Sequence, residues 1–323
     1  MVKRIVFWVL VLAVAGGAHA QMWMGEYSSA WSDDRNWLGG EPTFGGKSVL
    51  VGKVTDPNRH EPVITEFGEL TSGRFFLNGR LFIESGDLTC FSRFYIGYAR
   101  SGPGEVTMTG GRIDILPGTV DLGRLSVGDE SPGTVNMYDG EINVTWPDGA
   151  EVGGIHWPDG SAPGYINMYG GVIRTSEVRW KERDNCIMTF YSSPKYPHGG
   201  RFMVKADQTK PDEDPGNVVR SSMTDKYARG DILTAIPGDV ILIKYDPVED
   251  VTVVESIPRD LLPKPCELYS DAIVDGLDLG VFVDNWLWSG PPGGNNAADF
   301  DGDGAVNFVD FAILAAQWLE TCE

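Results

Sequence analysis

The sequence predicts a mostly β fold: a short right-handed parallel β-helix, or solenoid, followed by a small pair of α-helical loop–helix units. Three observations support this: a glycine-rich repeat in mid-chain, a proline-rich break after it, and acidic loops with helix-like spacing near the C-terminus. Such changes of pattern indicate separate domains. The predicted division is a signal peptide over 1–20, a β-solenoid domain over 21–257, a linker over 258–265 and a second domain over 266–323.

The repeat has the form G-x-h-x-h-x-(G/D/S)-G-x-h, where h is apolar, and its copies begin at Gly79, Gly104, Gly133 and Gly164. Apolar residues at i and i+2 share one face of a strand, and the following glycine permits a tight turn with positive φ. One copy cannot bury its own apolar face, whereas stacked copies can. A period of this length therefore predicts a solenoid of about four to six coils.

Stacking the copies in register predicts which side chains face inward and which face outward. The expected interior stacks are Val106 with Val135 and Ile166, and Met108 with Met137 and Met168. The expected outer stacks are Asn136 with Asn167, and Tyr138 with Tyr169. An antiparallel β-sandwich is the alternative fold, because short strands alone do not distinguish the two.

The ends of a solenoid need covering. The segment 31–52, with its tryptophans and a Gly-Gly-Glu-Pro turn, is expected to form an N-terminal cap and first strand. The polar, proline-containing segment 205–222 is expected to be a loop. Closing strands are expected over 231–236, 239–245 and 251–254.

The N-terminus has the pattern of a secretory signal peptide. Lys3 and Arg4 precede an apolar run over 5–15, and small residues end at Ala20 in an A-x-A cleavage pattern. The run is shorter than the roughly 20 residues that a membrane-spanning helix needs, although a retained anchor is the alternative. The expected location is therefore secreted, extracellular or at the cell surface, with no membrane span in the mature chain.

Charge and cysteine content narrow the possible functional classes of the protein. The chain has 46 acidic and 26 basic residues and a net charge of −20, so no basic patch that could neutralise phosphates is expected and nucleic-acid binding is excluded. Four cysteines in a secreted chain suggest disulfide bonds. Because Cys266 and Cys322 bracket one segment, their pairing is favoured, while the pairing of Cys90 and Cys186 stays open.

A calcium-binding loop is the strongest motif. Residues 299–310 place oxygen donors at loop positions 1, 3, 5, 9 and 12, with a backbone carbonyl at position 7 and Gly304 at the sharp turn. The predicted ligands are Asp299, Asp301, Asp303, the carbonyl of Ala305, Asn307 and Asp310. The segment after the loop has helix spacing, with Phe311, Leu314, Ala315 and Trp318 on one face. An acidic surface turn is the alternative.

This tail resembles the type I dockerin family, which consists of two tandem F-hand units of the EF-hand type. In this comparison Trp318-Leu319 of the second unit aligns with Trp286-Leu287 of the first. That register makes Asp271, Asp275 and Asp278 the ligands of a second, weaker calcium site at positions 5, 9 and 12. Glu267, Tyr269 and Ala272 depart from the family pattern at positions 1, 3 and 6.

The resemblance also implies a partner. Type I dockerins bind cohesin modules and attach carbohydrate-active enzymes to scaffolds, with recognition commonly at loop positions 10 and 11, often Ser-Thr. Here those positions hold Gly276-Leu277 and Phe308-Val309. A cohesin-like or cell-surface protein module is the expected partner. The whole architecture is similar to secreted solenoid proteins of Planctomycetes-type bacteria.

The predicted function is non-catalytic extracellular attachment or assembly connected with polysaccharide degradation. A polysaccharide lyase or glycoside hydrolase carried by the dockerin is one alternative, although the candidate carboxylates are scattered and a charged loop over 181–184 is a weak match. The scattered carboxylates are Asp114, Asp121, Asp129, Glu130, Asp139 and Glu141. A carbohydrate-binding module is the other alternative, in which Trp146 and Trp157 stack on sugar rings unless they pack against the solenoid.

Overall fold

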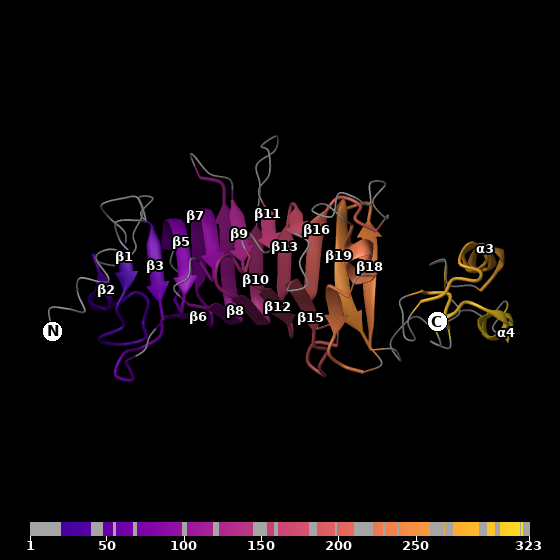
Figure 1. Ribbon diagram of the computed structural model, residues 1–323, viewed down its shortest axis with the longest axis horizontal. Helices are drawn as coiled ribbons and strands as arrows, with labels where there is room; N and C mark the ends of the chain where they lie inside the picture. Colours follow the sequence, from indigo (N-terminus) through magenta and orange to yellow (C-terminus); the bar gives the residue numbers. More distant parts are fainter. Residues whose placement is uncertain are drawn as a thin grey trace.

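The chain winds into a β-solenoid of about five turns, followed by a small helical unit (Figure 1). The computed structural model describes residues 21–39, 48–53, 56–66, 70–98, 102–118, 123–144, 154–157, 161–180, 186–197, 199–209, 222–228, 230–237, 239–258, 268, 274–290, 296–300, 304–316 and 318.

Three parallel β-sheets, here called faces A, B and C, run along the solenoid. Face A consists of β4 (Val63–Ile64), β6 (Arg80–Ile83), the first half of β8 (Gly104–Leu116), the first half of β10 (Gly133–Val144), β12 (Gly164–Met168), β15 (Cys186–Phe190) and β17 (Ile232–Thr234). Face B consists of the first parts of β5 (Leu70–Asn78) and β7 (Asp87–Ile96), the second halves of β8 and β10, then β13 (Val172–Thr175) and β16 (Arg201–Lys205).

Face C completes each coil. It consists of β1 (Gln21–Trp23), β3 (Val49–Gly52), the second parts of β5 and β7, β9 (Arg124–Val127), β11 (Gly154–Trp157) and β14 (Val178–Trp180). The chain therefore passes through A, B and C in turn, and each coil lies against the previous one.

The register confirms the repeat and rules out the sandwich alternative. Gly104 pairs with Gly133, and Gly133 pairs with Gly164, so the glycines that begin successive copies lie side by side on adjacent strands. The first copy follows the same rule, because Arg80, next to its glycine, pairs with Glu105. These pairs are all parallel, whereas a sandwich of hairpins would pair them antiparallel.

The predicted interior stacks are present. The apolar side chains at the two inward positions of face A lie on neighbouring strands and are fully buried: Val106, Val135 and Ile166 in one column, Met108, Met137 and Met168 in the next. Burial of each such side chain contributes about 1.5–3 kcal/mol, so the core is built one layer per coil.

Glycines form a column at the corner between faces A and B. Gly111, Gly140 and Gly171 have φ angles of 70°, 91° and 70°, as the turn in each repeat predicts. A Cβ atom on Gly140 would lie 2.5 Å from the carbonyl oxygen of Gly111 on the coil before it. The corner thus needs glycine both for its backbone conformation and for close stacking.

The predicted outer stacks are present as well. Asn167 donates a hydrogen bond of 2.8 Å from its side-chain amide to the Oδ1 of Asn136. Tyr138 and Tyr169 stack with ring centroids 4.4 Å apart, and Tyr191 extends the stack at 4.2 Å. The sequence did not reveal Tyr191, because its coil lacks the glycine motif that marks the other copies.

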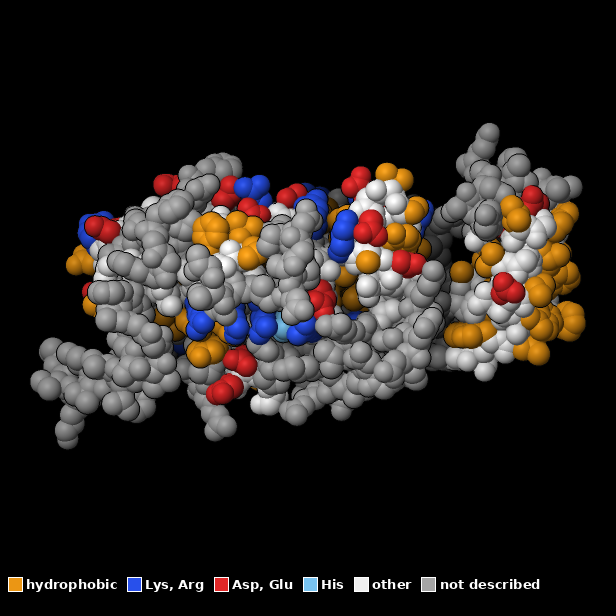
Figure 2. Space-filling view, turned by 90° about the horizontal axis from the view of Figure 1, so that it is seen from above, with side chains coloured by type: hydrophobic (Ala, Val, Ile, Leu, Met, Phe, Trp, Pro, Cys, Tyr) orange, Lys and Arg blue, Asp and Glu red, His pale blue; other side chains and the backbone are white. Residues whose placement is uncertain are grey.

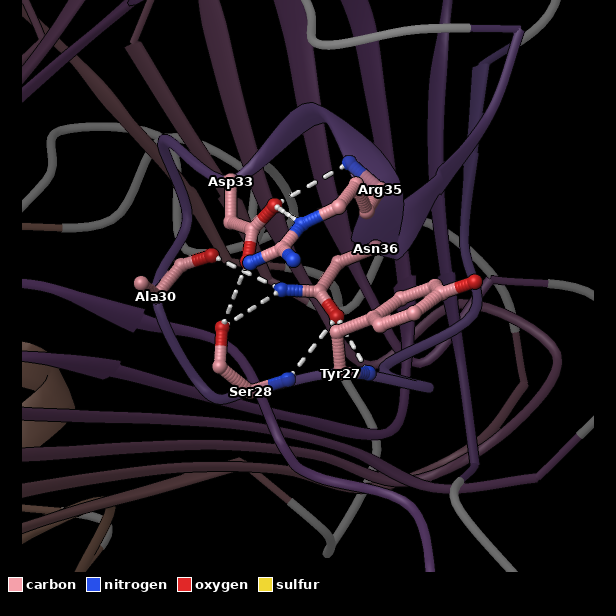
Figure 3. Close-up of polar contacts among 6 residues, drawn as sticks. All are labelled: Tyr27, Ser28, Ala30, Asp33, Arg35 and Asn36. Atoms are coloured by element: carbon pink, nitrogen blue, oxygen red, sulfur yellow. Dashed lines mark hydrogen bonds and ion pairs between the residues drawn. The ribbon is translucent and has the colours of Figure 1, made fainter.

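The N-terminal end is capped as expected. Trp23, Trp31 and Trp37 pack on one another, and the ring of Trp31 stacks on Phe75 of the first full coil at 5.8 Å. Strand β2 (Trp37–Leu38) pairs antiparallel with β1. The turn around the 3-10 helix η1 (Asp34–Asn36) is held by polar contacts, drawn in Figure 3.

Asn36 is the centre of that turn (Figure 3). Its buried Oδ1 accepts hydrogen bonds from the backbone N–H groups of Tyr27 at 2.9 Å and Ser28 at 3.1 Å. Its Nδ2 donates to the Ser28 hydroxyl at 2.9 Å and to the Ala30 carbonyl at 3.1 Å. One side chain therefore forms hydrogen bonds with four backbone or hydroxyl groups next to the tryptophan cap.

The C-terminal end closes with antiparallel strands. Strand β19 (Val251–Ile257) pairs antiparallel with β16, and β18 (Val240–Asp246) pairs antiparallel with β19. With β17 and the short helix α2 (Met223–Ala228), these strands cover the last coil, which confirms the expected closing strands. The change to antiparallel pairing ends the stack of parallel coils.

The helical unit has its own core. Helices α3 (Gly276–Asp284) and α4 (Phe308–Ala316) enclose a cluster of buried apolar residues separate from that of the solenoid: Val274, Phe282, Ala298, Val306 and Leu314. The predicted signal peptide over 1–20, nearly all of the predicted linker, and both Cys266 and Cys322 lie outside the described residues.

Cys90 and Cys186 are buried free thiols, and the described part of the chain contains no disulfide bond. Burial raises the pKa of each thiol to about 12. Within the same described ranges, no helix is both long enough and apolar enough to cross a membrane.

Candidate functional site

The C-terminal unit is a structural repeat in which Gly276 of the first half corresponds to Phe308 of the second. These two residues begin helices α3 and α4, which each span nine residues. The residue before each helix accepts a hydrogen bond at the helix start: Asp275 from Leu277 N–H at 2.7 Å, and Asn307 from Val309 N–H at 2.8 Å. Oxygen-bearing side chains at this position are the usual N-caps.

A buried carboxylate closes each loop. The Oδ1 of Asp310 accepts from the backbone N–H of Phe300 at 2.6 Å, and its Oδ2 accepts from Asn307 N–H at 2.9 Å. The Oδ1 of Asp278 accepts from Leu268 N–H at 2.7 Å, and its Oδ2 from Asp275 N–H at 2.9 Å.

These four hydrogen bonds are equivalent under the shift that aligns Asp278 with Asp310. It is the same register that aligned the two Trp-Leu pairs in the sequence. In both units the last position of the loop is tied to the second and the ninth, so the loop forms a closed ring. Asp278 and Asp310 have no exposed surface. The sequence resemblance did not by itself reveal that these two carboxylates would be fully buried.

The second loop holds the predicted calcium donors that the structure describes. Asp299 is nearly buried, and its Oδ2 accepts from the backbone N–H of Gly304 at 3.0 Å. Gly304 has a φ of 91°, the left-handed conformation expected of the turn residue. The Ala305 carbonyl accepts from the side-chain amide of Asn307 at 3.2 Å.

Asp301, Asp303 and Asp271 lie outside the described residues. In the part of the chain that is described, no group of three or more His, Cys, Asp or Glu side chains is arranged to hold a metal ion. The chemistry of the donors fits calcium nonetheless. Segment 266–323 has eleven acidic residues and no Lys or Arg, so backbone N–H groups, not basic side chains of the segment, hold its buried Asp278 and Asp310 carboxylates. A bound divalent cation would stabilise them further.

The two units are linked through backbone contacts. Ser289 and Ala305 form an antiparallel bridge. Beside it, Val306 N–H donates to the Trp288 carbonyl at 2.9 Å, and Leu287 N–H donates to the Val306 carbonyl at 3.0 Å. The segment after α3 therefore pairs with the loop before α4, which fixes one unit against the other.

Much of the apolar surface of this unit is exposed. Only Leu314 of the predicted apolar face of α4 is buried, while Phe311 and Trp318 keep 40% and 42% of their surface exposed. The expectation that these residues share one packed face is thus only partly met. Phe308 is 75% exposed and Leu287 is 73% exposed. Figure 2 shows hydrophobic side chains gathered along the edge of this unit.

The scattered carboxylates of the solenoid lie mainly in surface ion pairs. On face B, Arg112 lies 2.9 Å from Asp114, and Arg174 lies 3.2 Å from Glu141. Such pairs form a charge ladder along the coils. Asp121 and the charged loop over 181–184 lie outside the described residues.

Asp139, another of these acids, is held by several polar contacts. Its carboxylate accepts a short hydrogen bond from the Tyr196 hydroxyl and lies 3.4 Å from the Lys195 ammonium. Burial alone would raise the pKa of Asp139, but the hydrogen bonds from Tyr196, Gly140 and Lys195 lower it overall. This carboxylate is therefore held ionised beside the exposed tyrosine stack.

The predicted glycan contacts are only partly described. Trp146 lies outside the described residues, and Trp157 is described in its backbone alone, in strand β11. The structure therefore does not place the two rings relative to each other.

The structure also gathers basic side chains, which the net charge did not lead us to expect. Arg74, Arg93 and Arg124 are in register on face C. A sequence signal exists: each arginine is followed by an inward apolar residue and then by a second outward position. The numbers of residues between these short segments vary, so the pattern is hard to recognise in the sequence.

Comparison with family models, curated proteins and solved structures found no match.

Proposed function

We propose that this chain is a secreted, non-catalytic attachment protein whose dockerin-like C-terminal unit binds calcium and docks onto a partner protein. One observation carries the proposal: two successive loop–helix units close their loops with equivalent buried carboxylates, Asp278 and Asp310. Duplicated loops of this kind form compact calcium modules. The signal peptide pattern supports export to a calcium-containing extracellular medium.

The second loop supplies the stronger site. Asp299, Asp301, Asp303, Asn307 and Asp310 would bind calcium together with the Ala305 carbonyl. A carboxylate has about four acceptor sites, so Asp310 can accept two N–H groups and still bind a metal ion. Bound calcium would supply the positive charge that segment 266–323 lacks.

The first loop is expected to be weaker. Asp271, Asp275 and Asp278 remain as donors, but Tyr269 offers no carboxylate at position 3 and Ala272 replaces the turn glycine. Fewer charged ligands and a poorer turn lower calcium affinity.

The partner would bind the exposed apolar surface. Loop positions 10 and 11 hold Leu277, Phe308 and Val309, all exposed. Exposed apolar patches of this kind mark protein–protein interfaces. A cohesin-like or cell-surface module with an apolar centre and a basic rim fits this acidic unit, in contrast to the polar Ser-Thr contacts common in the family.

Calcium binding is tested by calorimetry on the whole mature chain. Asp303→Ala should lower calcium affinity at least about tenfold, because it removes one charged ligand of the stronger site. Asp284→Ala is the matched control: it removes an exposed acid from the end of α3, outside both loops, and should change little. Absence of calcium binding by the unmodified chain would overturn the proposal.

Docking is tested with purified cohesin modules immobilised on a sensor, with calcium and with chelator. The double variant Leu277→Ser, Phe308→Ser should lose binding at least about tenfold, because hydrophobic contacts dominate such interfaces. Val248→Ser is the control, since Val248 is also highly exposed but lies in the β18–β19 turn. If calcium binds yet no cohesin does, the family partner is wrong while the calcium site stands.

A further inference from the structure

Face C presents a row of arginines across three successive coils. Arg74 pairs in register with Arg93, and Arg93 pairs with Arg124. The next residue on each strand is buried in the core: Phe75, Phe94 and Leu125. Because side chains alternate along a strand, the three arginine side chains leave their strands on the outer face. Adjacent strands, and so successive arginines, are spaced about 4.8 Å apart.

A second row on the same side runs beside the first, and all of its side chains except that of Arg179 are buried. In register order it consists of Phe76, Tyr95, Ser126, His156 and Arg179. One end of this row is aromatic and the other end is basic. Figure 2, a view onto the solenoid, shows basic side chains in a row beside a hydrophobic patch and a histidine.

The aromatic end is a rigid cluster in which the rings of Phe76 and Tyr95 are buried and that of Tyr98 is partly exposed. The rings of Phe76 and Tyr95 stack with centroids 5.4 Å apart and planes 8° apart, and Tyr98 packs against them at 4.5 and 4.9 Å. Arg93 joins the two rows, because its Nη1 donates a hydrogen bond of 2.8 Å to the Tyr95 hydroxyl. The arrangement thus places a fixed guanidinium directly beside aromatic rings.

These basic residues also interact within the protein. Arg179 pairs with Glu177 at 3.2 Å, and Arg74, Arg93 and Arg124 make further contacts of their own. Each guanidinium carries five N–H donors in a planar fork, so an arginine that already has a neighbour can still bind an anionic group.

We propose that face C binds a linear anionic polysaccharide that lies along the solenoid axis. Each coil would offer one guanidinium to a carboxylate or sulfate group of the polymer, in the geometry that Arg–anion pairs favour. A sugar ring would stack on Tyr98, the partly exposed ring, which packs against the buried rings of Phe76 and Tyr95. This proposal extends the polysaccharide connection of the attachment function but does not depend on calcium or on the C-terminal unit.

Charge density favours a polysaccharide over a nucleic acid. The chain carries a net charge of −20, which repels any polyanion at a distance. Duplex DNA has one charge per roughly 1.7 Å of axis, so that repulsion is severe. A glycan with at most about one acidic group per sugar is repelled less, because its charges lie farther apart along the polymer.

The test measures binding of the full mature chain to defined polymers by calorimetry in chelator. The probes are polygalacturonate, a sulfated galactan, a neutral galactan and single-stranded DNA. Binding to either acidic glycan, and not to the neutral one, is expected, and the two acidic probes distinguish carboxylate from sulfate recognition. No binding to either acidic glycan, or tighter binding to DNA, would overturn the proposal.

Two double variants locate the site. Arg74→Gln with Arg124→Gln should weaken binding at least about tenfold, because two charge-assisted contacts are lost. Arg112→Gln with Arg174→Gln removes the same charge from face B and should change binding less than about twofold. Equal losses in both variants would contradict a face C site. Melting temperatures of both variants verify that they fold.

Tyr98→Ala tests the stacking contact separately. It should weaken glycan binding about fivefold or more and leave calcium binding unchanged, since a lost stacking contact is worth about 1 kcal/mol. Because the glycan measurements are made in chelator and calcium binding is measured separately without it, failure here leaves the calcium-dependent docking untouched. Conversely, an absent calcium site would not affect this result.

Discussion

The Oδ1 of Asp310 lies 2.6 Å from the backbone nitrogen of Phe300, and this contact ties the end of the second loop to its beginning. Its counterpart joins Asp278 to Leu268 in the first unit at 2.7 Å. A buried carboxylate that organises its own loop serves two purposes. It satisfies two backbone donors, and in the proposed calcium site it would also supply oxygen ligands.

Replacement of Asp310 by Ala should destabilise the C-terminal unit strongly. The change leaves the N–H groups of Phe300 and Asn307 without their acceptor, at about 1–3 kcal/mol each. Scanning calorimetry of the full chain should show a lower transition for this unit and an unchanged transition for the solenoid. Asp284→Ala, which removes an exposed acid, should leave both transitions in place; an equal effect from both variants would contradict the role assigned to Asp310.

Chelation should lower the melting temperature of the C-terminal unit alone. A ligand present at 100 times its Kd stabilises the folded form by about 2.7 kcal/mol, and removing calcium abolishes this contribution. The same thermal scan with and without chelator measures the effect. Asp303→Ala should reduce the effect of chelator, because a tenfold weaker site at the same calcium concentration contributes only about 1.4 kcal/mol. A shift of the solenoid transition instead would place the metal elsewhere.

Met137→Ala should destabilise the solenoid by about 2–5 kcal/mol. Met137 is fully buried between Met108 and Met168 in the interior column, so truncation leaves a cavity that stacked coils cannot readily collapse. Thr134→Ala, on the outer side of the same strand, serves as the control and should cost less than about 1 kcal/mol. Denaturant titrations of both variants provide the comparison.

Gly140→Ala should also destabilise the solenoid, by about 1–3 kcal/mol. The substitution puts a side chain at a φ of 91° and 2.5 Å from the carbonyl oxygen of Gly111. Gly52→Ala is the matched control, because its Cβ meets no atom within 4 Å and its φ is not in the left-handed region. Similar unfolding midpoints for the two variants would refute the stacking argument at this corner.

Cys90 and Cys186 should resist alkylation in the native protein at pH 8. Burial raises the pKa of each thiol to about 12, so the reactive thiolate is scarce and shielded. The unfolded thiol titrates near its ordinary pKa, so it binds fewer protons than the folded thiol between about pH 9 and 12. Stability contributed by these thiols is therefore present below about pH 9 and is lost as the pH rises through 12.

Mass spectrometry of alkylated peptides measures the four cysteines separately. Cys90 and Cys186 should react only after denaturation, whereas Cys266 and Cys322 should react only after reduction if the predicted disulfide forms. Rapid labelling of Cys90 in the native chain would show that its coil opens readily. Labelling of Cys266 without reductant would show that the predicted pair is wrong.

Much of the solenoid was predictable from sequence because the residues that specify each repeat lie close together in the chain. The apolar residues at i and i+2 and the turn glycines around Gly104, Gly133 and Gly164 specify strand, turn and next strand within a few residues of each other. The interior and outer stacks followed from aligning these copies. The donor spacing over 299–310 is local in the same way, since one short loop contains the whole pattern.

Other features depend on how coils lie against each other. Tyr191 joins the tyrosine stack although its coil lacks the glycine motif, and the exposure of Phe311 and Trp318 depends on what the short helices can cover. The sequence determined the repeats, the turns and the loop donors. Only the tertiary structure brought Arg74, Arg93 and Arg124 into one row, because backbone hydrogen bonds between coils set the register while the connecting segments vary in length.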